Sequence, residues 1–363
     1  MELAFYNKAF EPIGVLDAYQ SCLWVEKFRG VGDFELKVPP NSDLLELIRE
    51  TRWVSQPRSK KLMWIRKHGI VTDMEKGEEL IAKGFSAEVI LDMRVIPNVL
   101  DVNTNLEVVV RKLLNEQFLS PSTVTRKIAE MQIPSSFSST IAKTFTVNAV
   151  RQRKTVLDML DDFLAAAKVG YKIEYVGGTQ PLQFDIYDGV DYASGNGPGY
   201  VEFSEEYENL SVSSFVESDE TRFTRAHIYG QTGQTQVTVT LDKNETGLDM
   251  REVWLDAREV ESKNSAGQDY SVANYKKALT AYGQKIYGLN YTSKEYTCEV
   301  DPYLNFVYGV DYELGDLVKV DGSYGYSEVS RVTEIAYSAD ASKVTIVPTF
   351  TKDQDYTITE KLD

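Results

Sequence analysis

The stretch Phe34-Glu-Leu-Lys-Val38 decides the fold class, because its apolar and polar residues alternate strictly. Phe34, Leu36 and Val38 fall on one face of an extended chain, which is the period-two pattern of a half-buried β-strand. Pro39 and Pro40 follow at once and cannot donate to a strand ladder, so the strand ends there. Short runs rich in Val, Ile, Thr, Tyr and Phe recur along the 363 residues. The sequence therefore predicts a mainly β protein.

Three pairs of these runs flank short polar segments and predict β-hairpins. The pairs are 62–74 with 80–89, 222–229 with 236–241, and 326–337 with 343–350. Helical spacing of apolar residues interrupts the pattern three times, at 104–118, 155–168 and 271–287. In the second of these helices, Thr155 followed by Asp158 resembles a capping box, and Gly170 supplies the stop.

The helices fall into two blocks, and strand-rich sequence brackets each block. We therefore expect an α+β fold, mainly β with α/β insertions, in which two β-domains each carry an inserted helix-containing domain. The predicted division is 1–100 plus 200–216 for the first β-domain, 101–199 for its insertion, 217–245 plus 297–351 for the second β-domain, 246–296 for its insertion, and 352–363 for a C-terminal tail.

Composition excludes several classes of protein. The chain has 39 Lys and Arg against 55 Asp and Glu, a net charge of −16, which argues against a general nucleic-acid binder. The main basic stretch, 58–67, is interpreted as the exposed edge of a strand. Residues 1–10 lack the pattern of a signal peptide, and no run of about 18 apolar residues follows. We expect a soluble protein without a membrane segment, made and folded in a cytoplasm.

The scarcity of Cys and His argues against metal chemistry. Cys22 and Cys298 are far apart and lie in no CxxC cluster, so two buried free thiols are expected and not a disulfide or a zinc site. His68 and His227 are the only imidazoles, fewer than a zinc hydrolase usually needs. We expect no metal and no cofactor, and a cytoplasmic metalloenzyme is disfavoured.

Three short motifs resemble functional ones without completing them. The stretch 242–247 begins like a calcium loop, but Val253 stands at position 12, where a bidentate Glu is required. The stretch 84–88 lacks the second Gly of a nucleophile elbow. No helix follows the glycines at 195, 197 and 199, so they predict a loop and not a phosphate cradle.

Clustered acidic residues are interpreted as solvated surface. Asp158, Asp161 and Asp162 share the polar side of one predicted helix. The densest acidic run, 202–220, fits a surface that must not hold anions. We expect no catalytic residues in the chain.

Several stretches, taken in order, resemble one protein family. They are GDFELKVP at 32–39, KGF at 83–85 before Arg94, FDIYDG at 184–189, VEFS at 201–204 before Asn209, Arg251 with Asp256, and YELGDLV at 312–318. In content and order they resemble the tail-tip hub proteins of siphophages and related prophages, whose longer members are called tail-associated lysins. The positions that carry the resemblance, to which we assign structural roles, are Gly32, Phe34, Leu36, Pro39, Gly84, Arg94, Tyr187, Asp188, Gly189, Phe203, Asn209, Arg251, Asp256, Leu314, Gly315 and Asp316.

The resemblance implies two similar β-barrels of the tail-tube type and a ring of three subunits. It implies the distal tail protein, other tail-tip proteins and a tape-measure protein as partners, and a place at the virion tail tip after synthesis in the host bacterial cytoplasm. Tyr192 follows Asp191 where many relatives carry an Arg-Ser pair. The long C-terminal extension that bears a hydrolase or fibre domain does not occur in this sequence, so we expect no lytic activity and no enzyme.

Two functions follow from these observations. The first is a virion structural protein, a tail-tip or baseplate hub that closes the distal end of the tail tube and forms part of the DNA ejection channel. Its acidity suits a conduit that DNA passes without stable binding. The alternative is a carbohydrate-binding or carbohydrate-active β-protein that acts on the bacterial envelope. Trp24, Trp53, Trp64 and Trp254 would supply its stacking platforms, although aromatic residues on strands more often belong to cores or interfaces.

Overall fold

The structure is a computed structural model. It describes residues 1–352 except 74–76, 99, 152–153, 195–196, 205, 208, 210–211, 221, 233–235, 264–266, 290–292, 300–305, 323–326 and 341–342. The predicted C-terminal tail therefore lies outside the described residues, apart from Lys352.

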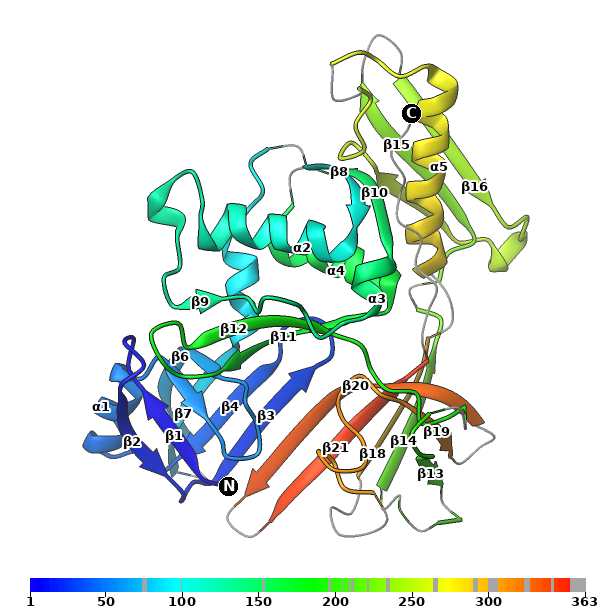
Figure 1. Ribbon diagram of the computed structural model, residues 1–363. Helices are drawn as coiled ribbons and strands as arrows, with labels where there is room; N and C mark the ends of the chain where they lie inside the picture. The colour runs from blue at the N-terminus through cyan, green and yellow to red at the C-terminus, as the bar shows by residue number, and fades with distance from the viewer. Residues whose placement is uncertain are drawn as a thin grey trace.

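One large sheet forms the base of the molecule (Figure 1). Its amino-terminal strands are β1 (Leu3–Tyr6), β2 (Pro12–Leu16), β3 (Ser21–Lys27), β4 (Asp33–Val38), β5 (Trp53–Ser55), β6 (Met63–Asp73) and β7 (Gly77–Ser86), with helix α1 (Ser42–Glu50) between β4 and β5. Its carboxyl-terminal strands are β13 (Glu202–Ser204), β14 (Val212–Ser218), β18 (Ser293–Glu299), β19 (Leu317–Asp321), β20 (Ser327–Asp340) and β21 (Val344–Thr351). We call these two sets the amino-terminal and carboxyl-terminal half-sheets.

The two half-sheets are joined edge to edge. Within the described residues the strand order is β14-β18-β21-β20-β3-β4-β7-β6-β5-β1-β2, and β19 and β13 branch from β20. The joint is the antiparallel pair of β3 and β20, which runs from Ser21 opposite Asp340 to Lys27 opposite Glu334. The prediction of a mainly β fold is confirmed. The two closed barrels are not found among the described residues, because the sheet continues across this joint and leaves β2 and β14 as its ends.

The first inserted unit, residues 87–187, covers one face of the amino-terminal half-sheet (Figure 1). It contains η1 (Ala87–Met93), β8 (Leu100–Asn105), α2 (Leu106–Leu114), the π-helical turn η2 (Asn115–Leu119), η3 (Val124–Arg126), β9 (Met131–Gln132), α3 (Ile141–Thr144), β10 (Thr146–Arg151), α4 (Val156–Ala167), β11 (Gly170–Tyr175) and β12 (Leu182–Tyr187). One core runs through this unit and into the sheet, since Trp53 and Leu62 pack with the buried faces of α2 and α4.

The second inserted unit, residues 225–289, forms a separate lobe. It lies beyond the first inserted unit, on the side away from the amino-terminal half-sheet (Figure 1). It contains β15 (Arg225–Thr232), β16 (Gln236–Asp242), η4 (Gly247–Asp249), β17 (Glu252–Asp256) and α5 (Val272–Leu289). Its three strands pair only with one another among the described residues, and β15 lies between antiparallel β16 and parallel β17. Helix α5 covers one face of this sheet through a small core around Ile228 and Leu279.

The alternation of apolar and polar residues predicted these strands correctly. Phe34, Leu36 and Val38 are all buried on one face of β4, as their alternation predicts. All three predicted hairpins are confirmed as antiparallel pairs: β6 with β7, β15 with β16, and β20 with β21. The predicted segment 80–89 ends early, since residues after Ser86 form η1.

The three predicted helices also form, with differences at their ends. Asn105, and not Thr104, caps α2 by accepting a hydrogen bond from the Val108 N–H at 3.0 Å. Thr155 caps α4 as predicted, accepting from Asp158 N–H at 3.1 Å. Gly170 is not the stop of this helix. Lys168 ends it in the left-handed region, with φ of 57°, and Gly170 begins β11.

The segment division by residue number stays a prediction, but strand pairing bears on it. β13 lies within the predicted first β-domain, and β14 crosses its predicted end at residue 216. β13 nevertheless pairs with β19, and β14 with β18, both in the carboxyl-terminal half-sheet. β15 and β16, placed with the second β-domain, share a sheet with β17. Of the helices that the structure describes, none is long and apolar enough to cross a membrane.

Candidate functional site

Phe28 lies where the two half-sheets and the first inserted unit meet. Its N–H donates to the Thr333 carbonyl of the carboxyl-terminal half-sheet at 2.9 Å, and its own carbonyl accepts from the Tyr171 N–H of the inserted unit at 3.1 Å. The Tyr187 ring packs edge-on against the Phe28 ring at 5.4 Å, and the Arg331 guanidinium lies over it at 5.0 Å. One buried aromatic residue thus ties three parts of the chain together. We call this region the junction.

Two glycines allow the junction to close. A Cβ on Gly189 would lie 1.7 Å from the Gly315 carbonyl oxygen, a distance no side chain tolerates. Gly315 has φ of 101°, which favours glycine, and a Cβ there would lie 2.5 Å from the Phe28 ring. A Cβ on Gly170 would lie 2.2 Å from the Phe28 ring. This close approach explains a glycine at position 170 better than a helix stop does.

Asp316 fastens the two sides of the junction by hydrogen bonds. Its Oδ1 accepts from the Val190 N–H and its Oδ2 from the Glu313 N–H, both at 2.7 Å. Arg331 Nη1 donates to the Gly315 carbonyl at 2.5 Å. Burial raises the pKa of the Asp316 carboxyl, against the opposing effect of the two N–H groups. The structure therefore brings together five resemblance positions, which are Tyr187, Gly189, Leu314, Gly315 and Asp316.

Buried charges lie beside the junction, and no sequence pattern predicted them. Lys61 is 5% exposed, and its Nζ lies 2.9 Å from Glu88 Oε1 and donates to the Lys27 carbonyl at 3.2 Å. Glu26 accepts a 2.8 Å hydrogen bond from Trp24 Nε1, and burial raises the pKa of its carboxyl against the opposing effect of Lys61. The interpretation of 58–67 as an exposed edge is wrong, because β6 lies between β5 and β7 and Lys61 points inward.

Five resemblance positions serve the packing of the amino-terminal half-sheet. A Cβ on Gly32 or Gly84 would lie 2.0 Å from the carbonyl oxygen of a neighbouring strand, Val25 and Trp64 respectively. Phe34 and Leu36 are core residues. Pro39 follows β4 directly.

Asp188 and Arg94 belong to the first inserted unit and its rim. Asp188 Oδ2 accepts from the Thr140 N–H at 2.7 Å and the Ile141 N–H at 3.2 Å, so it caps α3. Arg94 donates to the carbonyls of Met93 and Arg126 at 3.0 and 3.3 Å.

The remaining four positions lie in the carboxyl-terminal part. Phe203 is buried among aromatic rings, with Tyr312 at 5.2 Å and Phe350 at 4.9 Å. Asn209 is buried and bridges the Ser204 N–H and the Glu202 carbonyl, both at 2.9 Å. Arg251 pairs with Asp219 at 2.9 Å. Hydrogen bonds from Arg258 lower the pKa of Asp256 to about 2.

The incomplete motifs acquire structural explanations. Residues 242–247 form a turn in which Asp242 Oδ1 accepts from the Asn244 N–H at 2.8 Å, and no group of three His, Cys, Asp or Glu side chains lies together for a metal in the described part of the chain. Ser86 is buried and its Oγ accepts from the Gly32 N–H at 2.8 Å, so it is no nucleophile. Residues 195–196 lie outside the described residues, and a Cβ on Gly197 would meet the Asp191 carbonyl oxygen.

The cysteines and the acidic residues of α4 differ in how deeply they are buried. Cys22 is buried, and burial raises the pKa of its thiol to about 12; the Cys298 side chain lies outside what the structure describes. The expectation of a solvated acidic face on α4 holds for Asp158 and is wrong for Asp161. Burial raises the pKa of Asp161 to about 6, against the opposing effect of a hydrogen bond from the Tyr171 hydroxyl.

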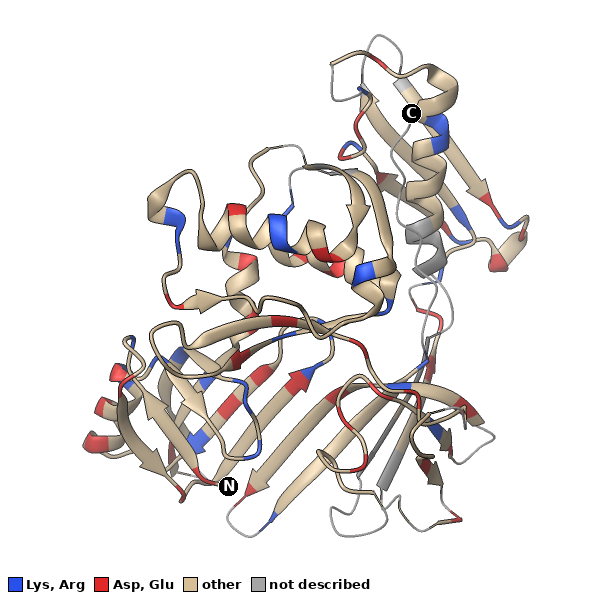
Figure 2. Cartoon of the chain, viewed as in Figure 1, with Lys and Arg blue, Asp and Glu red and all other residues tan. Residues whose placement is uncertain are grey.

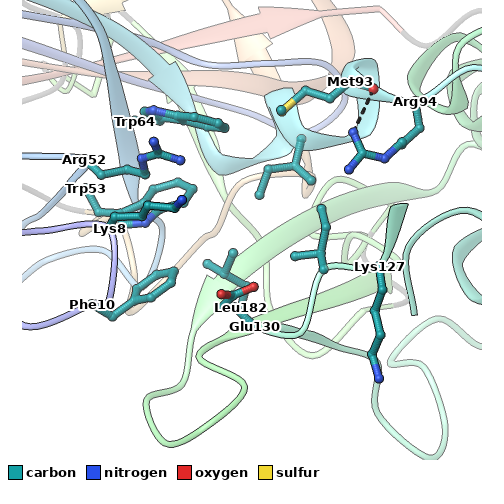
Figure 3. Close-up of a pocket in the computed structure, with 12 residues that line it drawn as sticks. Lys8, Phe10, Arg52, Trp53, Trp64, Met93, Arg94, Lys127, Glu130 and Leu182 are labelled. Carbon is teal, nitrogen blue, oxygen red and sulfur yellow. Dashed lines mark hydrogen bonds between the residues drawn. The ribbon is translucent and has the colours of Figure 1, made fainter. Parts of the chain in front are cut away.

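A cavity of about 320 Å³ opens between the amino-terminal half-sheet and the first inserted unit. Three aromatic side chains, Phe10, Trp53 and Trp64, line its sheet side, and Leu182 lies across from them (Figure 3). Ile90 also belongs to the lining. No sequence spacing links these residues, since they come from separate elements.

Comparison with protein families decides what kind of protein carries this fold. The model of the Siphovirus ReqiPepy6 Gp37-like protein family matches residues 2–351. The chain belongs to this family. It is thus a member of a family of siphovirus tail proteins, which the resemblance of the junction and sheet motifs also indicates. A search of curated protein sequences returned no match.

Solved structures of tail proteins share the fold of this tail protein. The tail protein from Neisseria meningitidis is 12% identical, superimposes with a TM-score of 0.55, and the alignment covers 97% of each chain. The 43 kDa tail protein of prophage MuSo2 from Shewanella oneidensis is also 12% identical with a TM-score of 0.55, covering 97% of this chain and 99% of that one. At this identity the likeness establishes the fold of the tail protein and nothing finer.

Proposed function

We propose that this chain is the hub of the tail tip, which closes the distal end of a tail tube and forms part of the channel for DNA ejection. The observation that carries the proposal is the whole-length likeness to tail proteins, which covers both half-sheets and both inserted units. A role confined to one domain would not need this complete architecture. The hub acts by assembly and gating, and no bond chemistry is assigned to it.

The open ends of the sheet support assembly into a ring. β2 and β14 each have one strand neighbour among the described residues, so they are the end strands of the described sheet, and end strands can pair with a strand of another copy. Val15 on β2 and Val216 on β14 are 62% and 51% exposed. In a ring of three subunits these edges would be covered by neighbouring copies, and barrels of the tail-tube type would be completed between subunits.

The charge of the chain supports a DNA conduit. Acidic positions occur on both half-sheets and on both inserted units (Figure 2). With a net charge of −16, the ring would repel phosphates, whereas each Lys or Arg contact would add affinity and slow transit. A strongly basic bore in the assembled ring would count against the proposal.

The proposed partners are other copies of the chain, the distal tail protein, other tail-tip proteins and a tape-measure protein. Light scattering should give the mass of a trimer at high concentration or after addition of the distal tail protein. Val15→Lys and Val216→Lys should prevent this assembly, because a charge on an edge strand opposes pairing. Val124→Lys is the matched control, since Val124 is 79% exposed but lies on η3 and not on a sheet edge. A chain that stays monomeric in both conditions and binds no tail ring would contradict the hub.

A second candidate, carbohydrate binding, is favoured by one surface of the second inserted unit. Trp254 is 61% exposed and lies on the sheet face opposite α5, with the rings of His227 and Tyr229 each 5.9 Å away. Exposed aromatic faces beside polar groups suit the stacking of sugars. Binding to a glycan array that is lost in Trp254→Ala and kept in Tyr200→Ala would support this candidate. No binding by the unmodified chain would remove it.

A further inference from the structure

The cavity beside the half-sheet gathers positive charge in an acidic protein. Lys8 and Arg52 lie on one side and Arg94 on the other, and Lys127 adds a fourth cation to the lining (Figure 3). Glu130 is the one carboxylate among the described lining residues. None of the four cations forms an ion pair within the described part of the chain, although the full sequence has a net charge of −16. The cavity is therefore a local positive site without its counter-charge.

Hydrogen-bond donors of this cavity also lack partners. Trp53 is only 4% exposed, yet its indole Nε1 has no acceptor among the described residues. Arg94 donates to the backbone carbonyls of Met93 and Arg126, but its Nε has no acceptor there either. Buried donors in folded proteins are nearly always paired, so these two are unusual, although both atoms are closed off from solvent in this structure.

The aromatic rings do not offer free faces for a stacked ligand. The guanidinium groups of Arg52 and Arg66 lie over the Trp64 ring, at 4.8 and 4.5 Å from its centroid. The Phe10 ring stacks on Trp53 at 5.3 Å and 18°. A sugar ring or a nucleobase would need a free ring face, and these faces are already occupied. The cavity therefore offers a ligand positive charge and hydrogen bonds, and no free aromatic face.

We propose that this cavity binds the carboxylate of an Asp or Glu side chain, presented by an acidic segment of a partner protein. Lys8, Arg52 and Arg94 supply the positive charge and the hydrogen-bond donors. The apolar residue next to the carboxylate packs against Leu182 and Ile90. A volume of about 320 Å³ takes one or two side chains and not a folded element. The inference does not depend on where in the tail the protein lies.

The test uses the full chain and two blocked hexapeptides, Gly-Leu-Glu-Leu-Glu-Gly and its counterpart with Gln for both Glu residues. Binding is followed by tryptophan fluorescence and by calorimetry at low and moderate salt. The acidic peptide should bind and weaken as salt rises, and the Gln peptide should not bind. The double variant Lys8→Gln with Arg52→Gln should lose at least tenfold in affinity.

Lys277→Gln is the matched control, because it removes an exposed cation from α5, far from the cavity. It should bind the acidic peptide as the unmodified chain does. Lys8→Gln alone guards against a folding defect, since Lys8 is exposed; it should fold normally and bind more weakly. Equal binding of the two peptides, or unchanged affinity in the Lys8 and Arg52 variants, overturns the proposal. So does a response to inorganic phosphate as large as that to the peptide, which would indicate an adventitious ion only.

Discussion

The two inserted units are attached to the molecule in different ways. The first shares its core with the amino-terminal half-sheet, where Trp53 and Leu62 pack among the buried residues of α2 and α4. It is also tied to the half-sheets through Phe28, which hydrogen-bonds to both sides. The second has a small core of its own around Ile228 and Leu279. Among the described residues, an ion pair joins it to the first unit, in which Lys154 Nζ lies 3.6 Å from Glu259 Oε1.

This difference indicates which parts should unfold together. Burial of a shared apolar core couples two elements strongly, whereas a partly exposed ion pair contributes about 1 kcal/mol or less. The half-sheets, the junction and the first inserted unit should therefore behave as one cooperative body. The second inserted unit should open on its own, as peripheral units with few buried contacts do. Four sets of variants test this comparison, in order of decreasing expected effect.

Replacing the buried lysine should have the largest effect. Lys61→Met removes the cation from two buried carboxylates and should cost about 3 to 5 kcal/mol in the free energy of unfolding at pH 7. The loss should shrink as the pH falls toward 5, because a carboxyl without its cation can take up a proton in the folded state. Denaturant unfolding at both pH values measures this. Lys60→Met is the exposed control, and an equal loss in the control would contradict the account.

Two buried leucines compare the units directly. Leu160→Ala in α4 and Leu279→Ala in α5 should each cost about 2 to 5 kcal/mol, because both side chains are fully buried. Hydrogen exchange should show the first loss across β3, β20 and the first inserted unit together. The second should appear only in α5, β15 and β16. Equal spread of both effects would show that the second unit belongs to the same cooperative body.

The junction glycines test the joint between the half-sheets. Gly189→Ala places a methyl group 1.7 Å from the Gly315 carbonyl oxygen and should cost about 3 kcal/mol, through displaced backbone. Gly69→Ala on β6 is the matched control, since a Cβ there meets nothing within 4 Å. Thermal unfolding of both variants measures the difference. A similar melting temperature for the two would mean that the junction is not a close contact.

Replacing the half-buried carboxyl of Asp161 on α4 should increase stability. Burial raises the pKa of Asp161 to about 6, so the folded state binds a proton between pH 4 and 6 that the unfolded chain has lost. Stability from this group therefore falls as the pH rises through that window, and the charged form costs the folded state about 1 to 3 kcal/mol at pH 7.5.

Asp161→Asn should recover that energy at pH 7.5 and give little gain at pH 4, where the carboxyl is protonated in the folded state. Asp158→Asn on the exposed side of the same helix should change little at either pH. Denaturant unfolding at the two pH values tests the sign. A destabilised Asp161→Asn at pH 7.5 would contradict it.

Local patterns predicted local structure well. Alternation located β4, and apolar spacing located α2, α4 and α5, because both depend on neighbours within one element. The joint of β3 with β20 lies between residues some 300 positions apart, and no short pattern encodes it. The same limit explains Lys61, whose exposure was predicted from its basic neighbours and whose burial depends on Glu88 in another element.

Of the two candidate sites, the sequence pointed to the residues of the junction and not to those of the cavity. The resemblance named Gly189, Gly315 and Asp316 as structural positions, and the structure places all three at one junction. The cavity was not predicted, since Lys8, Arg52 and Arg94 come from three elements and become a cluster only in the folded chain. The gathering of these cations around one cavity is visible only in three dimensions.

The proposed hub lies at the tail tip, and electron microscopy of purified phage particles tests this place directly. The particles are labelled with an antibody raised against the chain. Label should appear at the distal end of the tail on most particles. Label along the tail tube, on the capsid, or on no particle at all would contradict it.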